Sequence, residues 1–154
     1  MVYLTRRYRI SAAHRLHNDA LSADENARLY GKCNNPRGHG HDYGLEVTVA
    51  GEVDPRTGMV MDLGVLDALV EREVMSRLDH KHLNLDVENF RNRVPTTENL
   101  CIEIYNLLAR DFPVWPAAPD GESGSGARLK RVRVEETRSN FFEYEGEVAA
   151  GKRS

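Results

Sequence analysis

Two segments of this 154-residue chain alternate between apolar and polar residues, and in both of them histidines share the apolar parity. In the second segment the residues in phase are His39, His41, Tyr43, Leu45, Val47 and Val49. In the first segment His14 is in phase with Tyr8, Ile10 and Ala12. Because successive side chains of a strand point to opposite faces, this period predicts two paired strands, the second over residues 41–53, with imidazoles on one apolar face.

Three imidazoles on one face suit a zinc ion, which takes histidine nitrogen at about 2 Å. The sequence therefore predicts His14, His39 and His41 as metal ligands, with the open fourth position that is typical of catalytic zinc. The two cysteines of the chain are too few for a four-thiolate structural site. The H-x-H pair alone would favour a polar turn with solvated histidines. His17 competes with His14, but it lies in a polar segment, and we prefer His14.

The rest of the pattern predicts two helices followed by two more strands. Residues 54–58 have the composition of a turn, and Asp62 can cap a helix whose apolar positions recur at steps of three and four, namely Leu63, Leu66, Val70, Val74 and Leu78. Residues 79–94 are predicted as a polar loop. Thr96 or Thr97 can cap a second helix, which must end near Pro113 and has its apolar positions at Leu100, Ile104, Leu107 and Leu108.

The C-terminal part is predicted to be a hairpin of residues 129–136 and 139–148, after a linker-like insertion over residues 113–127. We expect one domain over residues 1–148 and a frayed tail over 149–154. Two strand pairs and two helices predict an α+β fold, in which a four-stranded antiparallel sheet carries both helices on one face.

Bulk properties agree with a small enzyme domain. A net charge of −3 gives no reason to expect nucleic acid or an anionic membrane as a partner. The N-terminus lacks the apolar region of a secretory signal, and no apolar run is long enough to cross a bilayer. Two cysteines in this context predict reduced thiols, and the expected location is the cytoplasm.

Five blocks, in order, resemble the 6-pyruvoyltetrahydropterin synthase family: residues 11–16, 31–43, 54–61, 78–83 and 96–99. The resemblance covers about residues 5–146. It implies the tunnelling fold, in which subunit sheets join edge to edge into a barrel. It also implies a homohexamer, built as a dimer of trimers, with active sites at subunit boundaries.

The implied activity is a zinc-dependent lyase reaction that converts 7,8-dihydroneopterin triphosphate to 6-pyruvoyltetrahydropterin and releases triphosphate, as in tetrahydrobiopterin biosynthesis. The related 6-carboxytetrahydropterin synthases of deazapurine biosynthesis, as in the queuosine pathway, remain an alternative, although their cysteine typically stands closer to H-x-H than Cys33 does here. A structural zinc-binding module is the non-enzyme alternative. Such a module would have no need of Cys33, Asp79 or Glu136.

By resemblance, Cys33 is the catalytic base, and a thiolate beside a dication is plausible at neutral pH. From chemistry alone Cys33 could also be a fourth zinc ligand or an inert residue. Asp79 and His80 are implied as the acid–base pair that reaches the cysteine across a subunit boundary. Cys101 lies among apolar residues of the second predicted helix, and we interpret it as a core residue.

Glu136 shares its parity with Val132 and Val134, so its carboxylate should face inward, where an unpaired charge is costly. The adjacent N–H donors of a pterin ring would satisfy it. The resemblance places Glu136 among the catalytic and substrate-binding residues, with Thr96 and Thr97 as further pterin contacts. Glu135 should face outward.

The sequence does not assign a definite role to several positions. The family usually continues the Glu-Thr pair with Asp-Asn, whereas this chain has Arg138-Ser139. Triphosphate requires cations, and the candidates beside the motifs are Arg15, Lys32 and Arg37. His82 stands where the family often has asparagine, and we interpret it as a solvent-facing side chain.

Overall fold

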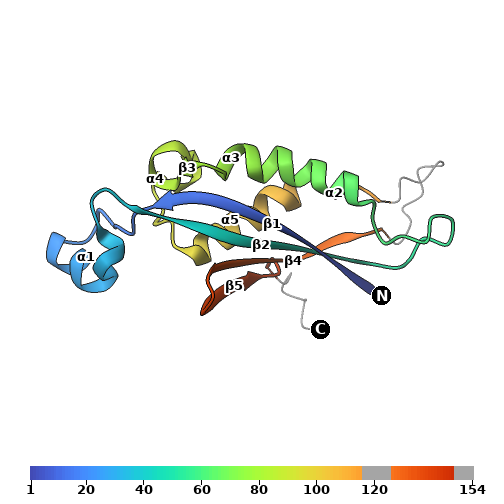
Figure 1. Ribbon diagram of the computed structural model, residues 1–154, viewed down its shortest axis with the longest axis horizontal. Coiled ribbons are helices and arrows are strands. Elements are labelled where there is room, and N and C mark those ends of the chain that lie inside the picture. Colours follow the sequence, from blue (N-terminus) through green and yellow to red (C-terminus); the bar gives the residue numbers. More distant parts are fainter. Residues whose placement is uncertain (116–125, 148–154) are drawn as a thin grey trace, which may run out of the picture.

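The computed structural model describes residues 1–115 and 126–147 (Figure 1). Its centre is one five-stranded sheet with the strand order β3-β1-β2-β4-β5. The strands are β1 (Val2–His14), β2 (His39–Gly51), β3 (Lys81–His82), β4 (Arg128–Thr137) and β5 (Asn140–Tyr144). The four longer strands pair antiparallel to one another, and β3 runs parallel to β1.

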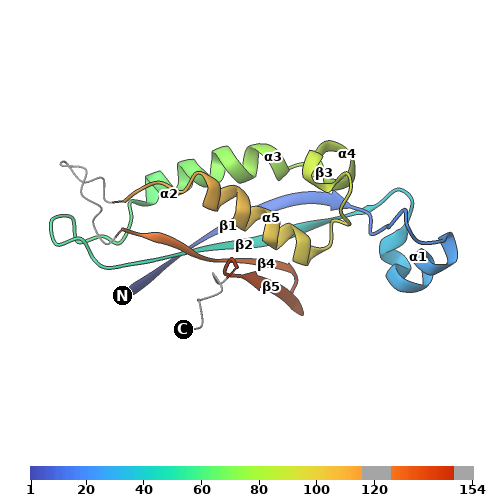
Figure 2. The same ribbon diagram turned by 180° about the vertical axis from the view of Figure 1, so that it is seen from behind.

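The helices that cover the sheet lie on one side of it, as the two opposite views show (Figures 1 and 2). The first is a continuous helical stretch made of α2 (Leu63–Val70), a π-helical turn η2 (Glu71–Met75) and α3 (Ser76–Leu78). The second is α5 (Thr97–Arg110). Short elements complete the fold: α1 (Ala23–Tyr30), η1 (Gly31–Asn34), α4 (Leu83–Asp86) and η3 (Glu88–Phe90).

The core lies between this helical layer and the sheet. The apolar parity of β1 and β2 is buried, with Ile10, Tyr43 and Leu45 at most 1% exposed. Four of the five predicted apolar positions of the first helix are also buried, whereas Leu63 is exposed. Positions 66, 70, 74 and 78 are four residues apart, and the i→i+5 turn at η2 widens the helix so that steps of four stay on one face.

The prediction of a four-stranded, purely antiparallel sheet was wrong in one respect. The backbone of residues 79–94, predicted to be a loop, contains β3, α4 and η3. Lys81 and His82 pair with Ala12 and Ala13, and the N–H of His80 donates to the carbonyl of Ser11 at 2.6 Å. A two-residue strand is too short to show a period in sequence, and its pairing depends on contacts about 70 residues apart.

Other boundaries differ from the predictions in smaller ways. The second strand begins at His39 and ends at Gly51, two residues earlier at each end than predicted. The helix α1 was not predicted, although Ser22 and Glu25 form a capping box at its start. The prediction for residues 113–127 falls largely outside the described residues, as does that for 149–154; at the base of this insertion, the N–H of Ala127 donates to the carbonyl of Trp115 at 2.8 Å.

A candidate metal centre beside a carboxylate

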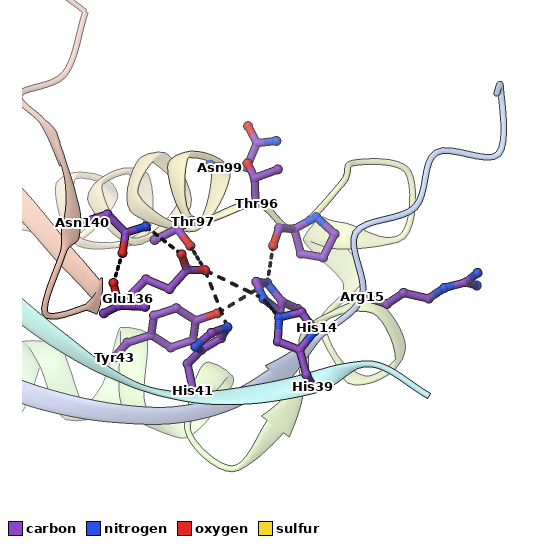
Figure 3. Close-up of polar contacts among 12 residues, drawn as sticks. His14, Arg15, His39, His41, Tyr43, Thr96, Thr97, Asn99, Glu136 and Asn140 are labelled. Atoms are coloured by element: carbon purple, nitrogen blue, oxygen red, sulfur yellow. Dashed lines mark hydrogen bonds and ion pairs between the residues drawn. The ribbon is translucent and has the colours of Figure 1, made fainter. Parts of the chain in front are cut away.

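The register of β1 and β2 brings the three predicted histidines together (Figure 3). His14 stands directly opposite His39, and His41 stands opposite Ala12 on the same face. One ligand nitrogen from each histidine lies within 4.8 Å of the other two. The Nε2 atoms of His14 and His39 are 3.1 Å apart, close to the separation of roughly 3.3 Å expected for two nitrogens of a tetrahedral zinc site.

The surroundings favour the neutral form of two of these imidazoles, those of His14 and His39. Burial lowers the pKa of His14, which is 1% exposed, and the neighbouring His39 and His41 lower it further. Burial, followed by the field of His41, also lowers the pKa of His39. The carbonyl of Pro95 accepts a hydrogen bond from Nδ1 of His14 at 2.7 Å, which leaves Nε2 of His14 with a free lone pair. Neutral imidazole is the form that binds metal ions.

One ring nitrogen supports the fit of a cation. Nε2 of His41, on the side of the ring that faces Glu136, is buried without a hydrogen-bond partner among the described residues. Buried polar atoms are normally paired, so a converging group with an open nitrogen is better satisfied by an ion than by the protein alone. The donor set, three imidazole nitrogens and no thiolate, fits zinc with an open coordination position.

Glu136 comes from the end of β4 and points toward the same group (Figure 3). Its Oε1 atom lies 3.7 Å from Nε2 of His41 and 3.9 Å from Nε2 of His14. Burial raises the pKa of Glu136, but hydrogen bonds from Thr97 and Asn140 and the field of the histidines lower it by more. The net shift is downward, so Glu136 is an anion at neutral pH. The inward orientation predicted for this side chain agrees with the structure, in which it is 19% exposed.

Two side chains hold this carboxylate in place. Thr97 Oγ1 donates to Glu136 Oε1 at 2.7 Å, and Asn140 Nδ2 donates to Oε2 at 2.9 Å. Thr97 is the first residue of α5, while Thr96 is the N-cap and accepts from the N–H of Asn99 at 3.3 Å. Of the two predicted threonines, only Thr97 therefore contacts the carboxylate.

Sequence reasoning missed three contributors to the site. Asn140 was overlooked because it follows the Arg138-Ser139 turn, where the sequence departs from the family pattern. Tyr43 had been assigned to the core, yet its hydroxyl lies 3.4 Å from Nδ1 of His14, and burial raises the pKa of this tyrosine well above its usual range. Pro95 acts through its backbone carbonyl, which has no sequence signature. The parity of Tyr43 with His39 and His41 was the one available signal.

The predicted catalytic groups outside this cluster lie on separate elements. Cys33 is half-buried in η1, and its carbonyl accepts from the N–H of Leu16 at 2.9 Å. Asp79 and His80 form a tight pair, with Oδ2 of Asp79 2.9 Å from Nδ1 of His80. Within the described parts of the chain, no hydrogen bond or ion pair joins Cys33 to this pair. His80 is 81% exposed and has a φ of 56°, a strained value for a residue with a side chain.

The remaining histidines occupy other surroundings. His17 lies 3.3 Å from Asp19 and contacts Asn34, away from the three-histidine group. His82 is half-buried rather than solvent-facing, which contradicts its predicted exposure. Its ring packs against Gly38, so closely that a Cβ at that glycine would come within 2.8 Å of Nε2 of His82.

These features define an α+β protein with a candidate metal centre of three imidazoles and an adjacent carboxylate for a donor-rich ligand. The chain belongs to the 6-pyruvoyl tetrahydropterin synthase family, whose model matches residues 3–147. This match confirms the predicted resemblance. No helix among the described residues combines the length and apolarity needed to cross a membrane.

Known relatives agree with this membership. The chain is 45% identical to human 6-pyruvoyl tetrahydrobiopterin synthase, over 94% of this chain and 91% of the relative. It is 42% identical to the enzyme of that name from Drosophila melanogaster, over 95% of this chain and 80% of the relative. The structure of Caenorhabditis elegans 6-pyruvoyl tetrahydropterin synthase superposes with a TM-score of 0.83 at 40% identity, covering 95% of this chain and 96% of that one. A putative 6-carboxy-5,6,7,8-tetrahydropterin synthase from Archaeoglobus fulgidus is 34% identical over 68% of this chain.

Proposed function

We propose that this protein converts 7,8-dihydroneopterin triphosphate to 6-pyruvoyltetrahydropterin with release of triphosphate, as a carbon–oxygen lyase. The observation that carries the proposal is the convergence of three imidazoles beside Glu136, in a chain 45% identical to a named 6-pyruvoyl tetrahydrobiopterin synthase over most of both lengths. The carboxylate offers acceptors for the N–H donors of a pterin ring. The imidazoles lie beside it, where the side chain of that pterin would extend.

His14, His39 and His41 would hold one zinc ion. When bound, the ion supplies a Lewis acid that lowers the pKa of substrate hydroxyls and stabilises developing negative charge. The chain itself orients these ligands, because the carbonyl of Pro95 fixes the tautomer of His14. Glu136 would orient the ring, held by Thr97 and Asn140, and Thr96 at the N-cap of α5 would lie beside the ring.

Cys33 would accept the carbon-bound proton, and the Asp79–His80 pair would exchange protons with it. The pair is anchored for this role, since Asp79 Oδ1 accepts from the N–H of Ser11 at 2.8 Å while Oδ2 holds His80. The His80 side chain is exposed on its own chain, which supports the proposal that it serves the site of a neighbouring subunit. Reduced Cys33 agrees with a cytoplasmic location.

The proposed assembly is a homohexamer of two trimers with sheets joined into a barrel. Two features of the sheet support it. β3 pairs with only two residues of β1, which leaves the rest of that edge of β1 unpaired by the described residues. β5 forms the other edge and carries an exposed Phe141. Uncovered edges favour pairing with another chain.

The test is product analysis after incubation of the purified protein with dihydroneopterin triphosphate. A tetrahydropterin with a three-carbon pyruvoyl side chain, together with one equivalent of triphosphate, is the expected result. A carboxylate on the ring with loss of acetaldehyde would assign the 6-carboxytetrahydropterin reaction instead. An unchanged substrate in the zinc-loaded protein would leave a structural zinc-binding module as the better description.

A further inference from the structure

A cavity of about 790 Å³ is rich in arginine and is lined by residues that stand next to the three-histidine group in the sequence, such as Arg15 after His14. Its lining includes Arg15, Arg37, Arg91 and Arg93. Asp19 is the single acidic residue among the described residues of this lining. Val94 also lines it and is followed by Pro95, whose carbonyl bonds His14. The lining therefore includes the chain neighbours of His14 and of Pro95, and the size of the cavity is typical of small-molecule sites.

Two of these arginines are already neutralised. Arg91 lies 2.9 Å from Glu88, and Arg93 lies 2.6 Å from Glu103. By contrast, within residues 1–115 and 126–147 no carboxylate lies within 4.0 Å of Arg15 or Arg37. Unpaired cations gathered at a concave surface create a field that favours an anionic ligand.

Hydrogen bonds fix both the backbone and the side-chain stem of Arg15. Asn84 clamps its backbone, accepting from the N–H of Arg15 at 2.8 Å and donating to its carbonyl at 2.9 Å. The Nε of Arg15 donates to the carbonyl of Asn34 at 3.1 Å. The terminal nitrogens of Arg15 carry no hydrogen bond to the described residues. A guanidinium with a fixed stem and free terminal donors suits bidentate contact with phosphate oxygens.

We propose that this cavity binds the triphosphate end of the substrate, with Arg15 and Arg37 as its principal cations. The inference rests on the proposed function. Figure 3 shows Glu136 and Arg15 on opposite sides of the three histidines. A substrate whose ring contacts Glu136 and whose hydroxyls reach the metal centre would extend its phosphorylated end toward Arg15.

The sequence places both arginines close to the metal ligands. Arg15 directly follows His14, and Arg37 stands two residues before His39. The ring of His82 packs on Gly38, and His82 lines the same cavity. The cations and the ligands are therefore built on the same strand ends, so that the distance between metal and phosphate is fixed by the backbone.

The experiment compares two oxidised probes, neopterin and neopterin triphosphate, by equilibrium binding to the zinc-loaded protein. Arg37→Ala and Arg15→Ala should each weaken binding of neopterin triphosphate about 10-fold, which equals about 1.4 kcal/mol, and leave that of neopterin unchanged. Arg15→Lys, which keeps the charge without the fork, should cost about threefold. Because Arg37 is exposed, its replacement should not disturb folding, which thermal melting checks.

Arg56→Ala is the matched control. Arg56 lies in the turn that follows β2, a strand that extends about 40 Å from His39 to Gly51, and its removal changes the net charge by the same amount. If Arg56→Ala weakens binding of neopterin triphosphate equally, the loss reflects net charge alone, and the inference is overturned. An undiminished preference for the triphosphate in Arg37→Ala and Arg15→Ala would also overturn it, while the proposed function would stand. If the zinc-loaded wild-type protein leaves dihydroneopterin triphosphate unchanged, the proposed function fails, and the inference fails with it.

Discussion

Glu136 can be tested by a change of one atom in its side chain. Glu136→Gln preserves shape but replaces a carboxylate oxygen by an amide NH₂ group. An ionised carboxylate offers about four lone-pair sites. Thr97 and Asn140 occupy two of them, which leaves two for a ligand. Two free acceptors match the two adjacent N–H donors of a pterin ring.

The substitution should weaken pterin binding by about 2–4 kcal/mol, or roughly 30- to 1000-fold. Glutamine has a single acceptor oxygen. If that oxygen keeps the bond from Thr97, its NH₂ group faces the NH₂ group of Asn140 or a ligand N–H. One charge-assisted bond is then lost and a donor–donor contact is gained.

The assay is a fluorescence titration with neopterin, alongside a zinc determination on the same preparations. Glu135→Gln is the matched control, since the side chain of Glu135 is 47% exposed and forms an ion pair with Arg133 at 3.8 Å. We expect this control to bind neopterin like wild type and both variants to keep their zinc. Equal affinities for the two variants would refute the assigned orientation. Loss of zinc in Glu136→Gln would instead make this carboxylate a metal ligand.

Four further outcomes follow from the structure. His14→Ala should abolish both zinc binding and turnover, and full zinc occupancy measured by atomic absorption would contradict its assignment. Cys33→Ala should keep zinc but lose nearly all turnover, and joint loss of both would make the thiol a ligand. Cys101 should resist iodoacetamide at pH 8 in the native protein, because burial raises the pKa of its thiol to about 12; mass spectrometry after digestion reads this, and rapid modification would be inconsistent with burial. Hydrogen bonding from Arg72, with the charge of Arg77, lowers the pKa of Glu73, so this group stabilises the fold above about pH 4.5 and less as pH falls below that value. Glu73→Gln should therefore lower the melting temperature at pH 7 and less so at pH 4, whereas an equal effect at both would contradict this linkage.

The strands that carry the metal candidates could be predicted because burial imposes a strict period on them. A shift of one residue between β1 and β2 would turn His14 or the His39–His41 pair to the opposite face. The apolar residues in phase with them, such as Ile10 and Leu45, therefore specify the register together with the site. The same reasoning gave the inward orientation of Glu136 from Val132 and Val134.

Residues 79–94 could not be predicted in this way. Their structure depends on single tertiary contacts, such as the bond from the N–H of Ser11 to Asp79 and that from the N–H of His80 to Ser11. Such contacts leave no periodic trace in the sequence. The capping box of Ser22 and Glu25 can be recognised in the sequence and would have predicted α1. The role of the Pro95 carbonyl could not be predicted, because every residue has a backbone carbonyl.

The order of groups along the site explains why its parts occur on so many elements. The ring, the hydroxyls and the triphosphate of the proposed substrate differ in charge and in hydrogen-bonding character. Glu136 on β4 can serve the first, the histidines of β1 and β2 the second, and Arg15 and Arg37 beyond the ends of those strands the third. If, as proposed, each group binds a different part of one ligand, changes at one end should alter ring affinity and changes at the other should alter phosphate preference, with zinc content constant in both. Independent losses at the two ends, additive in a Glu136→Gln, Arg37→Ala double variant, are the expected signature of this arrangement.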